Sequence, residues 1–380
     1  MGHPKIFVSA GDVSGDLHGA SLVRALKALA PEAEIRGLGG PRMREAGADL
    51  LADTTEFGVI GLVPIFRSFF RYWRLLREAG RFVREWQPDA AVTIDCPGFH
   101  FLLARRLKAC RIPTLWYIPP QLWAWAAWRV RKLRRRFTAV ACVLPQEEQF
   151  FRRHDVPVTF FGHPVVDYLR NLALDQAFID SLRTKKEDKV VALLPGSRRQ
   201  EIASILARQL VVARGLAERH PGCRFVLALA AEKHRPWAAP ILEGSDVTVR
   251  TVVGKTHEVQ RAADLALVAS GTATLETTFY ETPMAVFYNV TWSQWHLLGK
   301  RLVTVPFLSL PNSLAGRQIV PEYMRTNTPP EQMIDECSQM LVNPSVRSKV
   351  KADLAEITHR IGRPDTAGLA AREVLKLVKV

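Results

Sequence analysis

Residues 190–202 read VVALLPGSRRQEI and contain the pattern that decides the fold. The apolar run Val190–Leu194 predicts a buried strand, and a turn with Pro195 and Gly196 separates it from a helix that begins near Ile202. A strand that passes through a short turn into a helix is the building unit of a parallel α/β sheet.

The unit recurs along the whole chain. The expected strands are Ile6–Ala10, Ala90–Ile94, Thr114–Ile118, Val140–Leu144, Val190–Leu194, Phe225–Leu229, Val247–Thr251, Leu265–Ala269 and Met284–Tyr288. The expected helices are Leu17–Leu29, Ile202–Glu218, Thr274–Glu281 and a helical end, Val346–Val380. A chain of 380 residues exceeds one ordinary core. Sequence alone predicts an α/β protein of two doubly wound, Rossmann-like domains that face each other across a cleft.

The domain junction is expected near residues 165–188, where a polar stretch follows the turn Gly162–Pro164. This gives a first domain of residues 1–168 and a second of residues 169–354. A final helix, about residues 355–380, is expected to pack back on the first domain.

The composition limits the classes of binding partner and the cellular compartment that we expect. A formal net charge of +15 implies an anionic partner: nucleic acid, phospholipid headgroups or a phosphorylated substrate. Five widely spaced cysteines without a C-x-x-C pair argue against a disulfide framework or a zinc site, and for a reducing compartment. Neither a signal peptide nor a spanning helix is predicted. We expect a cytoplasmic protein that meets a membrane from one side only.

Two strand ends carry turns suited to a phosphate. Gly196, Ser197 and Arg198 follow the strand Val190–Leu194, where backbone N–H groups and a guanidinium favour an anion. The second turn follows Leu265–Ala269, and its candidate nucleotide-binding residues are Ser270, Gly271, Thr272, Thr274 and Glu276. Ordinary turn geometry and helix capping explain the same residue types, so both interpretations stay open.

The first half has the candidate catalytic group. Asp95 follows the strand Ala90–Ile94, where open α/β sheets bind ligands, and a carboxylate there suits a general base. His100 is a weaker catalytic candidate, because most histidines are structural, and we expect it to be a polar contact of an acceptor substrate. The loop Gly11–Asp16 matches neither a P-loop nor G-x-G-x-x-G, so we expect Asp12, Ser14 and Gly15 to contact an acceptor substrate instead.

An arginine stripe predicts a lipid surface. Arg67, Arg71, Arg74, Arg77, Arg81 and Arg84 share one face of a predicted helix, and Phe66 and Phe70 fall within that face. Aromatic rings among arginines suit the surface of an anionic membrane. A solvated basic helix is the ordinary alternative. Nucleic acid competes as a partner, but no nucleic-acid-binding motif accompanies these residues.

The motifs in this order resemble those of the lipid-A-disaccharide synthases, inverting glycosyltransferases with two Rossmann domains (the GT-B fold). The matching segments run from Ser9 to about Glu322, and each is weak alone while their order is specific. They are Gly11–Asp16, Ile94–Asp95, Gln121–Trp125, Gly162–Pro164, Leu194–Arg198, Ser270–Glu276 and Leu310–Asn312.

The resemblance implies a reaction. A UDP-linked 2,3-diacylglucosamine donates its sugar with inversion to 2,3-diacylglucosamine 1-phosphate, and UDP leaves. It implies no cofactor and no required metal, Asp95 as the base, and Arg198, Glu276 and Asn312 near the nucleotide. It also implies a peripheral location on the cytoplasmic face of the inner membrane; a homodimer is left open.

This chain departs from the family pattern at three positions. Asp12 stands where a Glu is usual, and Gly98 and His100 stand where Asp and Asn are usual. Two rival functions follow from the same residues. One is another GT-B enzyme, such as a UDP-GlcNAc transferase or 2-epimerase. The other is a basic protein that binds nucleotides or nucleic acid without catalysis.

Overall fold

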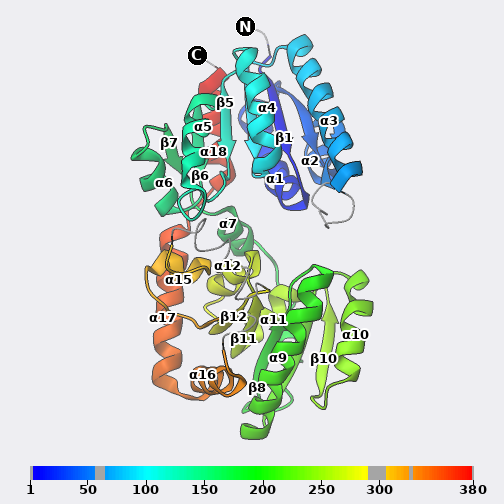
Figure 1. Ribbon diagram of the computed structural model, residues 1–380, viewed down its shortest axis with the longest axis vertical. Helices are drawn as coiled ribbons and strands as arrows, with labels where there is room; N and C mark the ends of the chain where they lie inside the picture. Colours follow the sequence, from blue (N-terminus) through cyan, green and yellow to red (C-terminus); the bar gives the residue numbers. More distant parts are fainter. Residues whose placement is uncertain (1–2, 56–64, 290–304, 325–327, 379–380) are drawn as a thin grey trace. The chain divides into compact units, whose positions relative to one another are not determined.

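The computed structural model describes residues 3–55, 65–289, 305–324 and 328–378, and within the helix at 65–86 it describes side chains from residue 71 onward. The chain divides into two compact units (Figure 1). Unit 1 comprises Met1–Asp167 and Ile361–Val380, and unit 2 comprises Tyr168–Arg360. The C-terminal segment therefore belongs to the same unit as the N-terminus.

Unit 1 is built on a seven-stranded parallel sheet in the order β3-β2-β1-β4-β5-β6-β7. Its strands are β1 (Lys5–Ala10), β2 (Glu34–Gly39), β3 (Asp49–Asp53), β4 (Ala90–Ile94), β5 (Thr114–Tyr117), β6 (Ala139–Cys142) and β7 (Val158–Phe160). Its helices are α1 (Val13–Leu29), α2 (Pro41–Glu45), α3 (Ile65–Trp86), α4 (Pro97–Ala109), η2 (Ala127–Arg129), α5 (Val130–Arg136), α6 (Pro145–Arg152) and α18 (Thr366–Val378). Helix α7 (Pro164–Arg170) begins in unit 1 and ends in unit 2.

Helices cover both faces of this sheet. Helix α1 packs against α2 and α18, whereas α3 packs against α4 and α4 against α5 (Figure 1). The central strands β1 and β4 are almost fully buried, which explains why their sequences are apolar without alternation.

Unit 2 has a six-stranded parallel sheet in the order β10-β9-β8-β11-β12-β13. The strands are β8 (Lys189–Leu194), β9 (Cys223–Leu229), β10 (Val249–Val253), β11 (Leu265–Ala269), β12 (Met284–Phe287) and β13 (Glu322–Tyr323). The helices are α8 (Gln176–Asp180), α9 (Arg199–Arg219), η3 (Glu232–His234), α10 (Arg235–Glu243), α11 (Thr256–Ala262), α12 (Thr272–Phe279), α15 (Leu310–Ala315), α16 (Pro330–Val342) and α17 (Pro344–Ile361).

Each sheet has one point where the strand order reverses. It lies between β1 and β4 in unit 1, and between β8 and β11 in unit 2. Open α/β sheets bind their ligands at the carboxyl ends of the strands at such a point. In unit 1, Ala10 pairs with Ile94, so Gly11 and Asp95 leave the sheet side by side. In unit 2, Leu194 pairs with Val268, which brings the two glycine turns together.

The expected α/β architecture is confirmed, with local differences. Strands β2, β3, β7 and β13 were not predicted, because they contain glycine or charged residues, or are only two or three residues long. The strand expected at Val247–Thr251 lies two residues later, at Val249–Val253. The helical end expected at Val346–Val380 is interrupted, because α17 ends at Ile361 and α18 begins only at Thr366, after Gly362 and Pro364.

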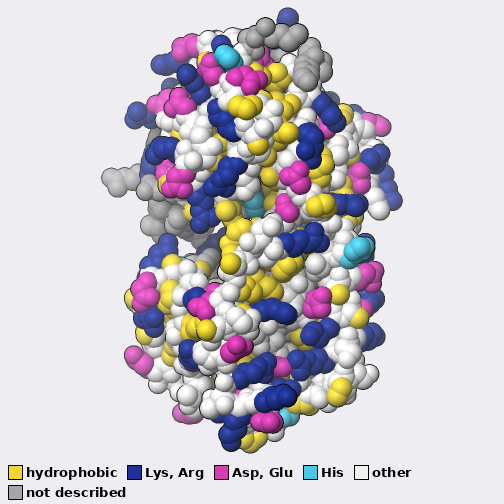
Figure 2. All heavy atoms as spheres, turned by 180° about the vertical axis from the view of Figure 1, so that it is seen from behind, with side chains coloured by type: hydrophobic (Ala, Val, Ile, Leu, Met, Phe, Trp, Pro, Cys, Tyr) yellow, Lys and Arg dark blue, Asp and Glu magenta, His cyan; other side chains and the backbone are white. Residues whose placement is uncertain are grey.

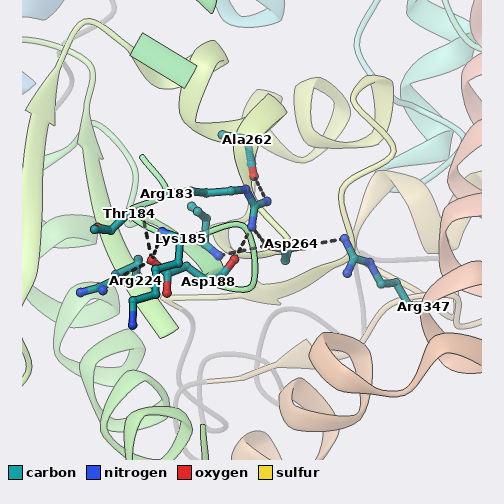
Figure 3. A network of polar contacts seen from close by, with 9 residues as sticks. Arg183, Thr184, Lys185, Asp188, Arg224, Ala262, Asp264 and Arg347 are labelled. Carbon is teal, nitrogen blue, oxygen red and sulfur yellow. Dashed lines mark hydrogen bonds and ion pairs between the residues drawn. The ribbon is translucent and has the colours of Figure 1, made fainter. Parts of the chain in front are cut away.

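A buried ion network fixes the amino-terminal edge of the unit 2 sheet (Figure 3). Asp264, which precedes β11, accepts from Arg183 at 2.7 Å and from Arg347 of α17 at 2.6 Å. It also accepts from the backbone N–H of Val190 at 3.0 Å. Burial by itself raises the pKa of Asp264, but the two arginines and this N–H outweigh burial and hold the pKa below its ordinary value.

Replacing Asp264 with Asn is expected to lower the free energy of unfolding of unit 2 by about 3 kcal/mol at neutral pH, because two arginines lose a buried partner. Because the pKa of Asp264 is lowered, its contribution is present above the ordinary carboxyl pKa and is lost as the pH falls through the lowered value. Urea unfolding at several pH values measures both effects. The difference between the two proteins should shrink in acid, and a difference that stays constant would contradict the prediction.

Candidate active site

The unit 1 site depends on a close approach of two loops. A Cβ atom at Gly11 would lie 2.3 Å from the Cys96 sulfur, so only glycine lets the loop after β1 touch the loop after β4. Asp12 follows Gly11 and caps α1, where its side chain accepts from the N–H of Gly15 at 2.7 Å. Asp12 and Asp95 are thereby brought near each other.

Asp95 has the properties of a general base. It is only partly exposed and directly follows the switch-point strand β4. Burial, and then the negative charge of Asp12, raise the pKa of Asp95 to about 6, against a smaller opposing effect of the Cys96 N–H. A base is most effective when its pKa lies near the working pH, so the raised pKa of this carboxyl is suited to proton transfer.

The pH dependence of the reaction should report this environment. If Asp95 is the base, it must be ionised to accept a proton, and kcat/KM should then fall to half near pH 6 on the acid side. In Asp12→Asn the repelling charge is gone while the capping oxygen remains, so the pKa of Asp95 falls and the midpoint should move to lower pH. Pseudo-first-order rates from pH 4.5 to 8 measure it, and a midpoint that stays in place would exclude Asp12 as the cause.

The other residues expected to contact the acceptor lie in different environments. Ser14 is exposed at the start of α1, whereas Gly15 is buried beside Asp12 and offers only its backbone. His100 is fully buried in α4, so its side chain is not accessible for the expected contact with the acceptor. Its ring nitrogens bond Ser9 at 3.0 Å and the Asp95 carbonyl oxygen at 2.6 Å.

The sequence analysis did not single out Glu147, a buried carboxyl of unit 1. Glu147 of α6 is 1% exposed and accepts from the N–H groups of Val143 and Leu144, both at 3.1 Å. Burial, despite these bonds and one from the Trp123 indole, raises the pKa of Glu147 to about 8, and the charge of Asp95 adds to the rise. The signal available in the sequence was the Glu two residues after Pro145, at a helix start.

In unit 2, the first turn orients an exposed guanidinium. Gly196 has φ +99°, and a Cβ atom there would meet the Glu201 carboxylate at 2.6 Å. Glu201 accepts from the N–H of Ser197 at 3.4 Å and from that of Arg198 at 3.3 Å. It also pairs with the Arg198 side chain at 2.5 Å, and that side chain is 79% exposed. Arg198 is therefore held at the start of α9 and accessible to an anion.

The second turn leaves its own helix start open. Gly271 has φ +152° and precedes α12, and a Cβ atom there would meet nothing within 4 Å. Ser270 and Thr272 are exposed, whereas Thr274 is buried and its hydroxyl donates to the Gly271 carbonyl at 2.7 Å. Backbone N–H groups at such a helix start suit a diphosphate.

Glu276 lies one turn further along α12 and is half-buried. Burial raises its pKa, while the nearby His257 and a 3.5 Å hydrogen bond from Gln260 work in the opposite direction. Its accessible part remains suited to accept hydrogen bonds from sugar hydroxyls.

Asn312 does not have a free side chain for a nucleotide. It is fully buried, and its amide oxygen accepts from the N–H groups of Ile319 at 2.7 Å and Val320 at 3.0 Å. Its amide nitrogen donates to the Val320 carbonyl at 2.8 Å and to Glu322 at 2.7 Å. All four hydrogen-bonding positions of the amide are occupied by protein. The side chain of Asn312 therefore ties the segment around residues 308–322 together, and its place near the nucleotide stays a prediction.

Comparison with known proteins identifies the family. The family model described as lipid-A-disaccharide synthetase matches residues 6–374. The chain belongs to the lipid-A-disaccharide synthase family.

Relatives within this family match along their whole length. A lipid-A-disaccharide synthase of Myxococcus xanthus is 37% identical over 376 residues, which cover 99% of this chain and 98% of the relative. One of Solibacter usitatus is 36% identical over 377 residues, with 98% of both chains covered. The chain is thus a glycosyltransferase.

Solved structures share the fold at low identity. A UDP-GlcNAc 2-epimerase from Neisseria meningitidis bound to UDP-GlcNAc aligns with a TM-score of 0.64 and 12% identity, over 99% of this chain and all of that one. The MurG protein of Acinetobacter baumannii aligns with a TM-score of 0.58 and 13% identity, over 98% and 99%. These likenesses show the GT-B fold of two parallel-sheet α/β domains. The family relation, and not the fold, separates this glycosyltransferase from the epimerases.

The arginine stripe predicted from the sequence lies on helix α3, and the structure describes the side chains of part of it. Arg71 and Arg74 are exposed on α3, and Arg74 pairs with Glu78 at 2.8 Å. The side chains of Phe66, Arg67 and Phe70 lie outside the described residues. The opposite face of α3 packs into the core through Leu75, Leu76 and Val83. Arg77, Arg81 and Arg84 are also exposed.

The positive charge is not confined to α3. On the face shown in Figure 2, Lys and Arg side chains are spread over both units with acidic side chains among them. Among the described helices, none is both long and apolar enough to cross a bilayer.

Proposed function

We propose that this chain transfers 2,3-diacylglucosamine from its UDP derivative to 2,3-diacylglucosamine 1-phosphate, with inversion at the anomeric carbon and release of UDP. The observation that carries the proposal is Asp95: a carboxyl with a raised pKa, at the switch point of unit 1 and beside a second carboxyl. Its environment matches the need for a base that removes a hydroxyl proton near neutral pH.

In the proposed reaction, an acceptor hydroxyl gives its proton to the Asp95 carboxylate. The hydroxyl oxygen forms a bond to the anomeric carbon, and the bond from that carbon to the diphosphate oxygen breaks. The electron pair leaves with UDP. Because the oxygen enters on the side opposite to the departing UDP, the anomeric configuration inverts.

Unit 2 supplies the groups that bind UDP. The N–H groups around Gly271 and Thr272 and the guanidinium of Arg198 oppose the negative charge that develops on the diphosphate. Glu276 binds hydroxyls of the nucleotide sugar. Asp12, Ser14 and the backbone of Gly15 contact the acceptor in unit 1.

Membrane association completes the proposal. Acylated substrates reside in a bilayer, and the exposed arginines of α3, including Arg71 and Arg74, oppose anionic headgroups at the cytoplasmic face. Phe66, Arg67 and Phe70 are assigned to the same surface from the sequence.

The direct test is an assay with a radiolabelled lipid acceptor and the acylated UDP-sugar, followed by chromatography. We expect a radiolabelled disaccharide, with UDP formed in equal amount. A parallel reaction without acceptor should give no epimerised sugar nucleotide. Absence of disaccharide, or epimer formation without acceptor, would refute the proposal.

A further inference from the structure

The backbone at the proposed base is held in an unfavourable conformation. Asp95 has φ +51° and Cys96 has φ +44°, so two consecutive residues with side chains occupy the left-handed region. This conformation is costly for most residues other than glycine, less so for Asp than for Cys, and two such residues in succession persist only where surrounding contacts enforce it. The contacts that enforce it therefore determine where the Asp95 carboxylate points.

The Asp95 carbonyl accepts hydrogen bonds from two side chains, one on the neighbouring strand β5 and one on helix α4. On one side the Trp116 indole of β5 donates to it at 3.2 Å. On the other side the Nδ1 atom of His100 lies 2.6 Å away. Trp116 and His100 are both fully buried, so neither bond competes with water.

Ser9 of β1 completes this arrangement. A carbonyl oxygen only accepts, so His100 Nδ1 must carry the hydrogen. Burial lowers the pKa of His100 to about 4, so the ring is neutral at pH 7 and its Nε2 atom is an acceptor. The Ser9 hydroxyl, 3.0 Å from Nε2, then donates to it and fixes the tautomer.

We propose that His100, oriented by Ser9 and assisted by Trp116, is a positioning residue for sugar transfer that aims the Asp95 carboxylate by bonding its backbone carbonyl. This rests on the proposed function, because it requires Asp95 to be the base. His100 does not touch substrate; it acts through the conformation of Asp95. Misplacing a reacting group by about 1 Å can cost on the order of a hundredfold in rate.

Two substitutions at position 100 distinguish the contributions of the two ring nitrogens, because each keeps the hydrogen bond of one nitrogen and removes that of the other. The amide nitrogen of Asn can take the place of Nδ1, so His100→Asn keeps the hydrogen bond to the Asp95 carbonyl and loses the one with Ser9. The amide of Gln reaches the place of Nε2, so His100→Gln keeps the hydrogen bond with Ser9 and loses the one to the Asp95 carbonyl. We expect kcat to fall about thirtyfold or more in His100→Gln but only about threefold in His100→Asn. The KM for the UDP-sugar should stay unchanged in both.

His154→Gln is the matched control. The Nδ1 atom of His154 lies 2.8 Å from the Phe150 carbonyl, so this change removes a similar bond elsewhere in unit 1. It should leave kcat unchanged, and thermal unfolding should show all three variants folded. Equal kcat values for the Gln and Asn variants at position 100 would overturn the inference. If the wild-type protein forms no disaccharide, the proposed function itself fails, which is a separate outcome.

Discussion

Asp95→Asn is expected to lower kcat about a thousandfold while the protein stays folded, because the amide cannot accept the acceptor's proton and general-base catalysis contributes about 10²- to 10⁴-fold. The side chains have nearly the same shape, and the change removes the repulsion between Asp95 and Asp12. The residual rate should also lose the dependence on pH near 6 that the carboxyl confers.

Single-turnover assays with saturating UDP-sugar and lipid acceptor measure this effect. Asp49→Asn, at an exposed position of β3 in the same unit, is the control and should retain full activity. An Asp95→Asn enzyme with more than a tenth of the wild-type kcat would show that another group takes the proton.

Arg198→Ala is expected to reduce kcat/KM by about 10²- to 10³-fold, the usual effect of removing one donor that stabilises developing negative charge. The backbone of the turn should survive, because Glu201 bonds the N–H groups of residues 197 and 198 independently of the side chain. Arg198→Lys keeps the charge but loses the two-pronged geometry, so its loss should be intermediate.

Initial rates with varied UDP-sugar, and inhibition by UDP, measure the effect. UDP should inhibit Arg198→Ala much more weakly than wild type. Arg214→Ala is the control, since Arg214 lies further along α9 and pairs with Asp246 at 2.7 Å. If UDP inhibits Arg198→Ala as strongly as it inhibits wild type, Arg198 does not bind the diphosphate.

Local sequence signals predicted the sheet strands nearest each switch point. The strands β1, β4, β8 and β11 are apolar because both of their faces are buried, and such runs stand out against the turns that follow. The edge strands β3 and β7 bury less of their length and were missed for that reason. The candidate site residues were predicted at these strand ends because catalytic and binding residues in this fold follow the switch-point strands.

The roles of His100 and Asn312 could not be read in the same way. Each is a polar residue beside a motif, and a polar residue there is equally suited to contact a ligand or to hold the loop. The difference is whether its hydrogen-bonding atoms are used by the protein. Ser9 and Trp116, which act together with His100, lie on the two different strands β1 and β5. They lie close to His100 and Asp95 only because of the order of strands in the sheet.

By itself, the sequence determined the strand–turn–helix units, the two glycine turns of unit 2 and the position of Asp95 after a buried strand. These follow from interactions between residues near each other in the chain. Only the tertiary structure showed that the missing side chain of Gly11 makes room for Cys96, and that Asp12 raises the pKa of Asp95. It also showed that His100 and Asn312 are buried and that their side-chain polar atoms are bonded within the protein. Burial and charge proximity depend on which strands become neighbours, and strand order is a property of the folded sheet.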